Sequence, residues 1–429
     1  FYYSGLYQQR QRRFILVSLS ILVYRLFVVG YSSLLKLASL FHPKAKLLIE
    51  GRSETWEKLS TINSSTPQRI WFHCASLGEF EQARPLIEAM KAKQPNLFIA
   101  LSFFSPSGYE VRKNYALADV VFYLPADTAL NARRLLQLLK PTTVYWVKYD
   151  FWHFILSEIH LQQIPNYLVC SIFRKEQPFF ATWGEFFRQQ LTFFTTIFVQ
   201  DEASKKLLAS IKVNALVAGD TRFDRVATIA AEYKSLEDIE HFCQSKKVMI
   251  AGSTWKVDID QLKAALPNDF FEHYRLIIVP HDVNESNLAY IETQFPGQTI
   301  RYSSYSSEVF APILIIDCTG ILSAIYRYGT FAYIGGGFGV SVHNILEAAV
   351  YGLPTIFGPQ HTKAKEALDL IQQKGAIAVS SSNELKQAIT YLQKEKECQW
   401  YSTVSKNYVE SNTSSTAQIL YATNFGGLL

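Results

Sequence analysis

The order of short apolar segments most strongly constrains the fold of this chain. From Arg69 onward, runs rich in β-branched and aromatic residues alternate with stretches of helical periodicity. The first series of predicted strands comprises residues 70–75, 97–103, 120–124, 143–147, 166–170 and 196–200. Strands that alternate with helices in this way predict a doubly wound parallel sheet.

A second series repeats this pattern in the latter half of the chain. Its predicted strands comprise residues 248–251, 275–279, 312–316, 331–334, 354–357 and 376–379. We therefore expect an α/β protein with two Rossmann-like domains facing a cleft, where open sheets of this type bind ligands. The predicted divisions are residues 1–48, 49–225 and 226–429, and the last helix could return to the first domain.

The charge distribution argues against nucleic acid as a partner. The net charge is +5, but residues 1–49 hold seven Lys/Arg and no Asp or Glu, so the remaining 35 Lys/Arg face 37 Asp/Glu. The folded body is therefore close to neutral, whereas a nucleic-acid groove needs a basic surface.

The amino-terminal segment is predicted to associate with a membrane. An apolar stretch from Phe14 to Leu35 is interrupted by one charge, Arg25, and basic residues flank both of its ends. The length is close to the ~20 residues that span a hydrocarbon core, but a central arginine is costly there. We prefer an anchor that lies on an anionic leaflet with its Lys/Arg at the headgroups. A cleaved signal peptide is the competing interpretation.

Glu79 is the first candidate for chemistry. It follows the first predicted strand at a strand-to-helix turn, within His73-Cys74-Ala75-Ser76-Leu77-Gly78-Glu79. A carboxylate at this turn can be oriented by backbone N–H groups for proton abstraction. The competing interpretation is an ordinary first-turn glutamate that the helix dipole favours.

A glycine-rich turn in the second half is a candidate phosphate site. The segment Ile334-Gly335-Gly336-Gly337-Phe338-Gly339 leads to His343-Asn344-Ile345-Leu346-Glu347, which predicts a strand, a turn and a helix start. Backbone N–H groups and a helix dipole hold phosphate in such arrangements. Glu347, one turn into the helix, could accept hydrogen bonds from ribose hydroxyls.

Several other polar residues are weaker candidates. Arg222, expected at the junction of the two domains, could face a sugar carboxylate or form an interdomain ion pair, and Ser253 could donate to phosphate or cap the next helix. Asp150 follows a strand and is the second candidate for a base. Five scattered cysteines and the histidines His73, His343 and His361 have no metal-ligand spacing, so we predict no metal site.

These segments together resemble 3-deoxy-D-manno-octulosonic acid (Kdo) transferase, the lipopolysaccharide enzyme that glycosylates lipid A precursor. The similarity rests on Ala75 to Glu79, Asp150-Phe151-Trp152, Gly219 to Asp224 and the Gly335 to Gly358 block. The resemblance implies a GT-B glycosyltransferase fold, CMP-Kdo and lipid A precursor as partners, no cofactor, and a place at the cytoplasmic face of the cell inner membrane.

The resemblance also implies roles for individual residues. Glu79 corresponds to the family's catalytic base. The CMP site of the family corresponds to the following residues: Pro280, His281, Thr319, Gly320, Ile321, Asn344, Ile345, Leu346 and Glu347. His281 stands where the family commonly has arginine, and Ile321 where it has glutamate. Lys148-Tyr149-Asp150 likewise replaces Glu-x-Glu.

The sequence therefore predicts an inverting transfer of Kdo from CMP-Kdo to lipid A precursor. Another two-Rossmann enzyme, such as a UDP-sugar transferase or epimerase, would share the cleft. A non-catalytic membrane scaffold would share the anchor, but would have little reason to keep both Glu79 and the Asn344 and Glu347 pair.

Overall fold

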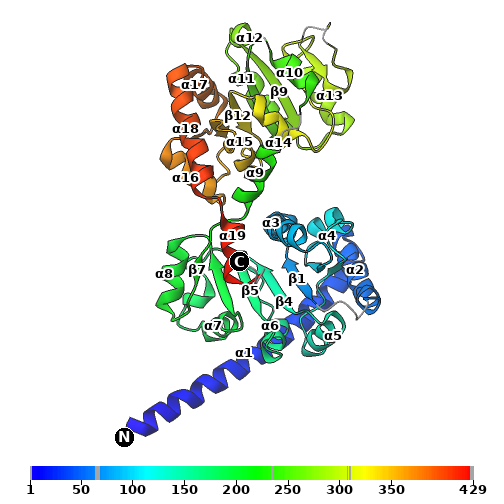
Figure 1. The fold of residues 1–429 in the computed structure, drawn as a ribbon, viewed down its shortest axis with the longest axis vertical. Coiled ribbons are helices and arrows are strands. Elements are labelled where there is room, and N and C mark those ends of the chain that lie inside the picture. Colours follow the sequence, from blue (N-terminus) through cyan, green and yellow to red (C-terminus); the bar gives the residue numbers. More distant parts are fainter. Residues whose placement is uncertain are drawn as a thin grey trace. The chain divides into compact units, whose positions relative to one another are not determined.

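The computed structural model describes residues 2–62, 68–232, 235–244, 246–306, 308 and 311–425, with side chains from Leu19 onward. Its contacts divide the chain into two compact units (Figure 1). The first unit is Phe1–Arg222 with Ser414–Leu429, and the second is Phe223–Thr413. The boundary predicted after residue 225 falls inside helix α9 (Arg222–Ala231).

The first unit is built on a seven-stranded parallel sheet. Its strand order is β3-β2-β1-β4-β5-β6-β7. The strands are β1 (Arg69–Cys74), β2 (Phe98–Phe103), β3 (Val120–Tyr123), β4 (Thr143–Val147), β5 (Asn166–Ser171), β6 (Thr196–Val199) and β7 (Leu216–Val217). All six strands predicted in this half are present, and β7 was not predicted.

Helices cover both faces of this sheet, so its central strands are apolar on both sides. The helices are α1 (Tyr2–Ala38), α2 (Pro43–Ser60), α3 (Leu77–Lys93), α4 (Pro106–Arg112), α5 (Ala129–Leu139), α6 (His153–Leu161), α7 (Glu185–Leu191) and α8 (Glu202–Ser210), with a short 3-10 turn, η1 (Pro178–Phe180). Phe72 packs in a core with Leu86 and Ile87 of α3, while Trp71 packs in a second core with Leu135 of α5. Each fully buried leucine or isoleucine contributes roughly 1.5–3 kcal/mol.

The second unit repeats this architecture. Its parallel sheet has the order β10-β11-β9-β8-β12-β13-β14. The strands are β8 (Lys247–Thr254), β9 (Tyr274–Pro280), β10 (Thr299–Arg301), β11 (Ile313–Ile315), β12 (Phe331–Ile334), β13 (Thr355–Phe357) and β14 (Ala376–Ala378). The α/β class with two parallel sheets is therefore confirmed, and β10 is the strand that the sequence pattern missed.

Helices and short 3-10 turns connect the strands of the second unit. After α9 come α10 (Glu237–Cys243), α11 (Lys256–Ala265), α12 (Phe270–His273), α13 (Glu285–Gln294), η2 (Tyr302–Ser304), α14 (Leu322–Ile325), η3 (Tyr326–Tyr328), α15 (Leu346–Ala349), α16 (Lys365–Gln373), α17 (Ser382–Leu392) and α18 (Glu395–Ser411). The sequence from Ser382 to Ser411 thus forms two separate helices, α17 and α18.

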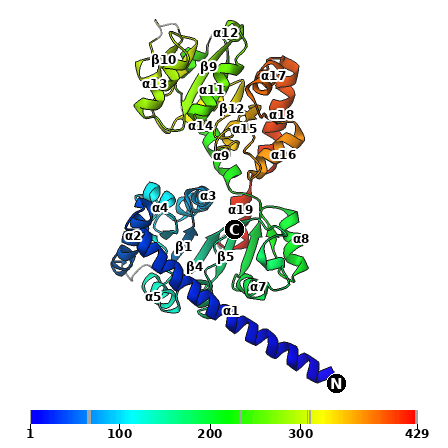
Figure 2. The same ribbon diagram turned by 180° about the vertical axis from the view of Figure 1, so that it is seen from behind.

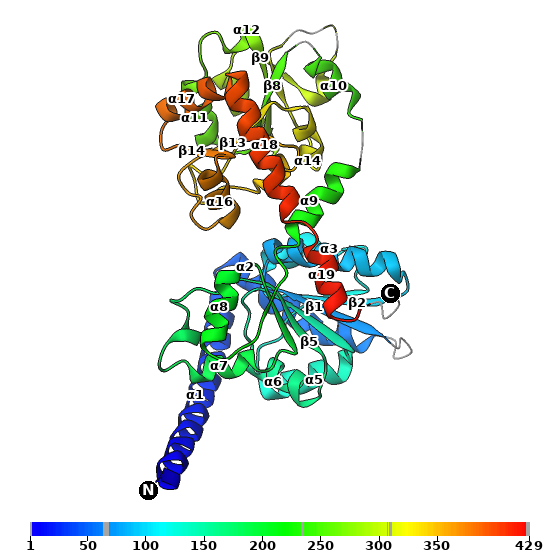
Figure 3. The same cartoon turned by 60° about the vertical axis from the view of Figure 1, so that its left-hand side comes forward.

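The last helix, α19 (Ser415–Ala422), lies in the first unit beside α3 (Figure 3). Ile419 and Leu420 are buried there in the core that contains Phe72. Tyr145 of β4 also donates a hydrogen bond to the Thr423 hydroxyl over 2.8 Å. The chain turns at Ser414, whose φ of 83° is left-handed, before α19 begins.

Helix α1 packs on the first unit along one side. Tyr24 donates to buried Asp127 over 2.6 Å, and Arg25 lies over the Phe154 ring, 5.4 Å from its centroid. Figure 2 shows this part of α1 beside α2. The other side exposes apolar residues that include Leu22, Leu26 and Phe27. The side chains of residues 1–18, including the predicted basic flank at Arg10, lie outside the described residues.

Candidate functional site

Each sheet has one point where the strand order reverses, and ligands of open α/β sheets bind at the carboxyl ends of the strands there. In the first unit this point lies between β1 and β4, since β2 and β3 extend to one side and β4 begins the other. Glu79 follows β1 and Asp150 follows β4. The fold therefore brings the first and second candidates for a base to one edge of the first sheet.

Glu79 is held by the turn that precedes its helix. It is the third residue of α3, and its side chain, only 9% exposed, accepts hydrogen bonds from the backbone N–H groups of Ala75 and Ser76, the latter over 3.2 Å. Burial and the nearby Asp150 charge raise the pKa of Glu79 to about 7, although the Ala75 hydrogen bond and the Lys148 charge oppose this. A carboxylate whose pKa lies near the working pH is suited to general base catalysis.

The backbone around this edge is strained. Lys148, at the end of β4, has a φ of 61°, and Cys170, in β5, has a φ of 54°. A non-glycine residue in this region costs of order 1–3 kcal/mol, and such residues cluster at functional sites. The strain supports the choice of this edge independently of Glu79.

Arg222 forms an ion pair rather than a free cationic surface. Its Nε and one terminal nitrogen donate to Asp220 over 3.0 and 2.8 Å, and Gln82 of α3 donates to the same oxygen over 2.9 Å. Burial pushes the pKa of Asp220 upward, but the Arg222 charge and hydrogen bonds bring the net pKa below the ordinary value. The interdomain ion pair predicted for Arg222 is not the one observed, because Asp220 belongs to the same unit; a role toward a sugar carboxylate stays a prediction.

The second reversal of strand order lies between β8 and β12, where the glycine-rich turn begins. A Cβ on Gly335 would lie 2.2 Å from the Ser253 carbonyl oxygen, and one on Gly337 would lie 2.5 Å from the Gly358 nitrogen. Close backbone packing therefore requires glycine at both positions. This packing accounts for part of the glycine pattern without any ligand.

The hydrogen bonds of this turn differ from the simple phosphate cradle that the sequence predicted. The N–H groups of Gly335, Gly336 and Gly339 donate to Gly252, Asp258 and Gly336, respectively. The helix expected from Asn344 is the four-residue α15, which begins at Leu346. A helix this short has only a small dipole, so a ligand here depends mainly on side chains.

Asn344 and Glu347 form one hydrogen-bonded group. The Asn344 amide donates to Glu347 over 2.9 Å, and the hydroxyl of Ser323, on α14, donates to the other Glu347 oxygen over 2.8 Å. Ile345 and Leu346, between them in sequence, are fully buried in the core of the second unit. Among these four predicted residues, only Asn344 and Glu347 present partly exposed side chains.

The other residues predicted for the CMP site also lie at this edge of the second sheet. Pro280 ends β9, and the following His281 donates its N–H to the Thr254 carbonyl over 2.9 Å. Thr319, Gly320 and Ile321 immediately precede α14, which carries Ser323. These residues therefore follow strands β9 and β11.

Ser253 does not cap a helix. It lies inside β8 with a φ of 54°, and the N-cap position of α11 is Trp255. The helix-cap interpretation of Ser253 is therefore wrong, whereas its possible donation to phosphate stays a prediction.

The rings of Trp255, His281 and His343 form a cluster that the sequence analysis did not predict. The His281 and His343 rings stack with centroids 4.3 Å apart, the Trp255 ring lies 4.5 Å from His281, and Trp255 Nε1 donates to His343 Nε2 over 3.0 Å. Burial and the His281 charge lower the pKa of His343. These residues are distant in sequence, so only the fold reveals that they meet.

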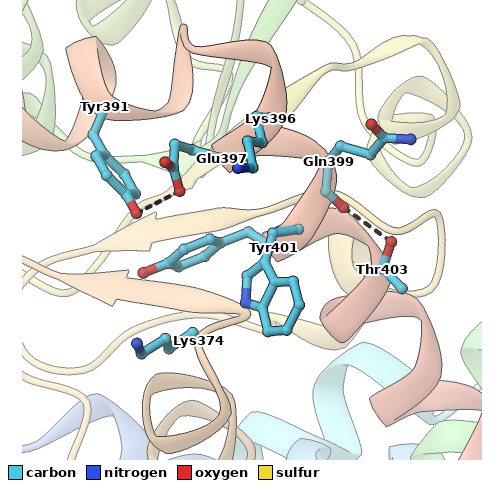
Figure 4. A pocket seen from close by; sticks show the side chains of 8 residues that line it. Lys374, Tyr391, Lys396, Glu397, Gln399, Tyr401 and Thr403 are labelled. Atoms are coloured by element: carbon cyan, nitrogen blue, oxygen red, sulfur yellow. Dashed lines mark hydrogen bonds between the residues drawn. The ribbon is translucent and has the colours of Figure 1, made fainter.

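Metal-ligand geometry and one surface hollow were each compared with the predicted site residues. Within the described ranges, no group of three or more His, Cys, Asp or Glu side chains is arranged to hold a metal ion. A hollow of about 560 Å³ lies on α17 and α18, lined by Tyr391, Glu397, Trp400, Tyr401 and other residues (Figure 4). It contains none of the predicted site residues.

The chain is similar to known proteins, both to one family over part of its length and to individual relatives over most of it. Residues 51–225 match the family described as 3-deoxy-D-manno-octulosonic-acid transferase (kdotransferase). The 3-deoxy-D-manno-octulosonic acid transferase of Aquifex aeolicus is 23% identical over 75% of this chain and 85% of its own length. The Rickettsia felis enzyme is 24% identical over 78% and 74%, respectively. A probable mitochondrial enzyme of Arabidopsis thaliana is 25% identical over 93% and 94%.

The chain is therefore similar to Kdo transferases over most of its length. Members of this family are glycosyltransferases. The family match, residues 51–225, includes Glu79, and the roles of Glu79 and of the Gly335 to Gly358 block stay predictions.

Solved structures agree with the two-unit fold. UDP-GlcNAc 2-epimerase from Neisseria meningitidis has a TM-score of 0.58 at 14% identity, covering 83% of this chain and all of its own. MurG from Acinetobacter baumannii has a TM-score of 0.53 at 11% identity, with coverages of 83% and 99%. At these identities the similarity shows the GT-B-like fold alone.

Proposed function

We propose that this protein is a Kdo transferase that moves Kdo from CMP-Kdo to a hydroxyl group of lipid A precursor, with inversion at the anomeric carbon. The observation that carries the proposal is the buried Glu79, whose pKa of about 7 lies far above that of an ordinary glutamate. Similarity to Kdo transferases supports Kdo as the transferred sugar, and the burial and raised pKa of Glu79 support its role as a base that activates an alcohol.

Glu79 would act in a single displacement. Its carboxylate removes the proton of the acceptor hydroxyl while that oxygen forms a bond to the anomeric carbon of Kdo. The bond from this carbon to the CMP phosphate oxygen breaks, and CMP leaves with the electron pair from the opposite face. One displacement with one base inverts the anomeric configuration, because no covalent enzyme intermediate precedes it.

The second unit would hold the donor. Asn344 and Glu347 offer amide and carboxylate groups to the ribose or cytosine, and Ser323 orients Glu347. His281 and the other residues that follow β9 and β11 would receive the phosphate. Hydrogen-bond donors placed there would stabilise the charge that develops on the leaving CMP.

The acceptor and the membrane belong to the first unit in this proposal. One stretch, Leu19–Ala38, is long and apolar enough to cross a membrane, with a mean hydropathy of 1.5. Tyr24, Arg25 and buried Val28 pack on the first unit, so this side of α1 is covered by protein. We therefore favour an anchor that lies at the cytoplasmic face of the inner membrane over a free spanning helix.

The test uses the full chain, a CMP-Kdo generating system and lipid A precursor in detergent or vesicles, with products measured by mass spectrometry. We expect a mass gain of one or more Kdo groups that depends on CMP-Kdo. Parallel reactions supply UDP-GlcNAc as donor or as epimerase substrate. Turnover of UDP-GlcNAc without any Kdo transfer would contradict the proposal and favour another two-Rossmann enzyme.

A further inference from the structure

A buried hydrogen-bond chain leads from the interior of the first sheet to the edge where Glu79 lies. Trp71 and His73 share one side of β1, and the parallel register sets His73 beside Ser102 of β2. Trp71 Nε1 donates to Ser102 Oγ over 2.8 Å, and Ser102 Oγ lies 2.8 Å from His73 Nδ1. His73 Nε2 then lies 3.1 Å from Asp150 Oδ2.

The chemistry of these groups fixes the direction of each hydrogen bond. The Asp150 carboxylate only accepts, so the facing Nε2 of His73 carries a proton, and Nδ1 of the neutral ring accepts from the Ser102 hydroxyl, which itself accepts from the Trp71 indole. His73 therefore carries its proton on Nε2 and donates to Asp150. The opposite tautomer would place an imidazole lone pair against a carboxylate oxygen, which is repulsive.

Asp150 is held at both its side chain and its backbone. Trp152 Nε1 donates to the same Oδ2 over 3.3 Å, and Trp146 Nε1 donates to the Asp150 carbonyl oxygen. His73 itself has no exposed surface, whereas the Asp150 side chain is 20% exposed. Three rings thus fix a carboxylate at the edge of the sheet.

We propose that His73 is a positioning residue for the proposed base, holding Asp150 as an ionised carboxylate beside Glu79. The inference rests on the proposed role of Glu79. Neither His73 nor Ser102 is required to touch a substrate, since both act through Asp150.

Four neighbours determine the charge felt by Glu79. Cys74 of β1 lies next to it, and Lys148, Tyr149 and Asp150 come from the loop after β4. Burial, together with Glu79 and Asp150, raises the pKa of Cys74, and burial raises that of Tyr149. Both stay neutral near pH 7. Lys148 and Asp150 therefore oppose each other, and a fixed Asp150 keeps Glu79 a stronger base than Lys148 alone would allow.

Asp150→Asn and Ser102→Ala test this series of hydrogen bonds at two of its residues. Asp150→Asn keeps the shape and an acceptor for His73 but removes the charge, and Ser102→Ala removes the group that fixes the His73 tautomer. The matched control is Ser171→Ala, because Ser171 is also buried in this sheet and donates only to the Phe198 carbonyl. We measure kcat/KM for Kdo transfer from pH 5 to pH 9.

We expect the acidic limb of the profile, near pH 7 in the wild type, to move down by about one pH unit in Asp150→Asn. A smaller downward shift is expected in Ser102→Ala and none in Ser171→Ala. The rate at pH 8 should fall by roughly three- to tenfold in Asp150→Asn, because a weaker base accepts the proton less readily.

A second readout does not depend on catalysis. The difference in unfolding free energy between each protein and its Glu79→Gln counterpart, followed with pH, reports the protonation of Glu79. Its midpoint should move down in Asp150→Asn and Ser102→Ala. An unmoved midpoint in Asp150→Asn, or equal midpoints in Ser102→Ala and Ser171→Ala, would overturn the inference. If the stability midpoint moves while Glu79→Gln retains full transfer, the inference about His73 and Asp150 is supported and the proposed role of Glu79 as the base is wrong.

Discussion

The reversal points of the two sheets have the same topology and opposite chemistry. Between β1 and β4, a buried carboxylate is made more basic by burial and by a second carboxylate. Between β8 and β12, stacked imidazoles and an indole lie beside a closely packed glycine turn, where we place the donor nucleotide. The comparison teaches that one architecture, used twice, places different side chains at equivalent edges, a buried carboxylate in one unit and stacked rings in the other.

The largest expected effect comes from removing the base. Glu79→Gln keeps the shape and an acceptor for the Ala75 and Ser76 N–H groups but cannot take a proton. We expect a loss of transfer of roughly 10²–10⁴-fold with unchanged CMP affinity, because the two edges have separate roles. Steady-state kinetics and calorimetric titration measure these quantities. The matched control is Glu81→Gln on the same helix, where Glu81 pairs with Arg112; an equal loss there would remove the distinction.

The second prediction concerns CMP affinity, which should fall when Asn344 or Glu347 of the second unit is replaced. Asn344→Ala and Glu347→Ala should each reduce CMP affinity by ~1–3 kcal/mol, because each leaves a hydrogen-bonding partner unsatisfied. Calorimetric titration at constant pH checks this, and a melting curve controls for folding. CMP affinity equal to that of the wild type in both variants would assign the nucleotide to another part of the second unit.

The third prediction concerns stability and pH. The pKa of Glu79 is about 7 in the folded protein against an ordinary value of 4.5, so the folded state binds more protons than the unfolded state between these values. Stability contributed by this group therefore falls as pH rises from about 4.5 to 7. Glu79→Gln should be more stable than the wild type by ~1–3 kcal/mol at pH 8, and the difference should vanish near pH 4.5. Urea titrations at both pH values measure it; a constant difference would argue that the Glu79 pKa is ordinary.

The smallest effect is expected at the membrane. Leu26 is 65% exposed on α1, away from the side that packs on the first unit. Leu26→Ser should weaken binding to anionic vesicles by about 1 kcal/mol, roughly fivefold, through lost apolar burial. Vesicle sedimentation measures this, with exposed Leu161→Ser on α6 as the control. If the Leu26 variant sediments like the wild type, the contact with lipid lies elsewhere.

Much of the fold was predictable because the strands are buried on both faces. Their apolar runs are continuous, and all predicted strands occur in the two sheets. The two missed strands, β7 and β10, are short edge strands that are only partly buried, so they carry little apolar signal. The sequence between the two series of strands, residues 226–244, holds α10 and most of α9, with residues 233 and 234 outside the described residues.

The candidate site was predictable only where it is local in sequence. Glu79 follows its strand directly, so the turn alone suggested it. The contact of His73 with Ser102 depends on strand register, and the contact of Trp255 with His343 joins residues 88 positions apart. Sequence patterns do not encode such pairings. The helix expected from Asn344 is shorter than its apolar pattern suggests. The apolar residues after Asn344 pack in the core of the second unit, but α15 includes only Leu346–Ala349.

The most direct test of the central claim is a single-turnover transfer measured with the enzyme saturated in CMP-Kdo. Saturation removes differences in donor affinity and leaves the chemical step. The account predicts that Glu79→Gln stays at least about 100-fold slower than the wild type, whereas Glu347→Ala recovers to near the wild-type rate. A Glu79→Gln variant that transfers Kdo at the wild-type rate under these conditions would contradict the account.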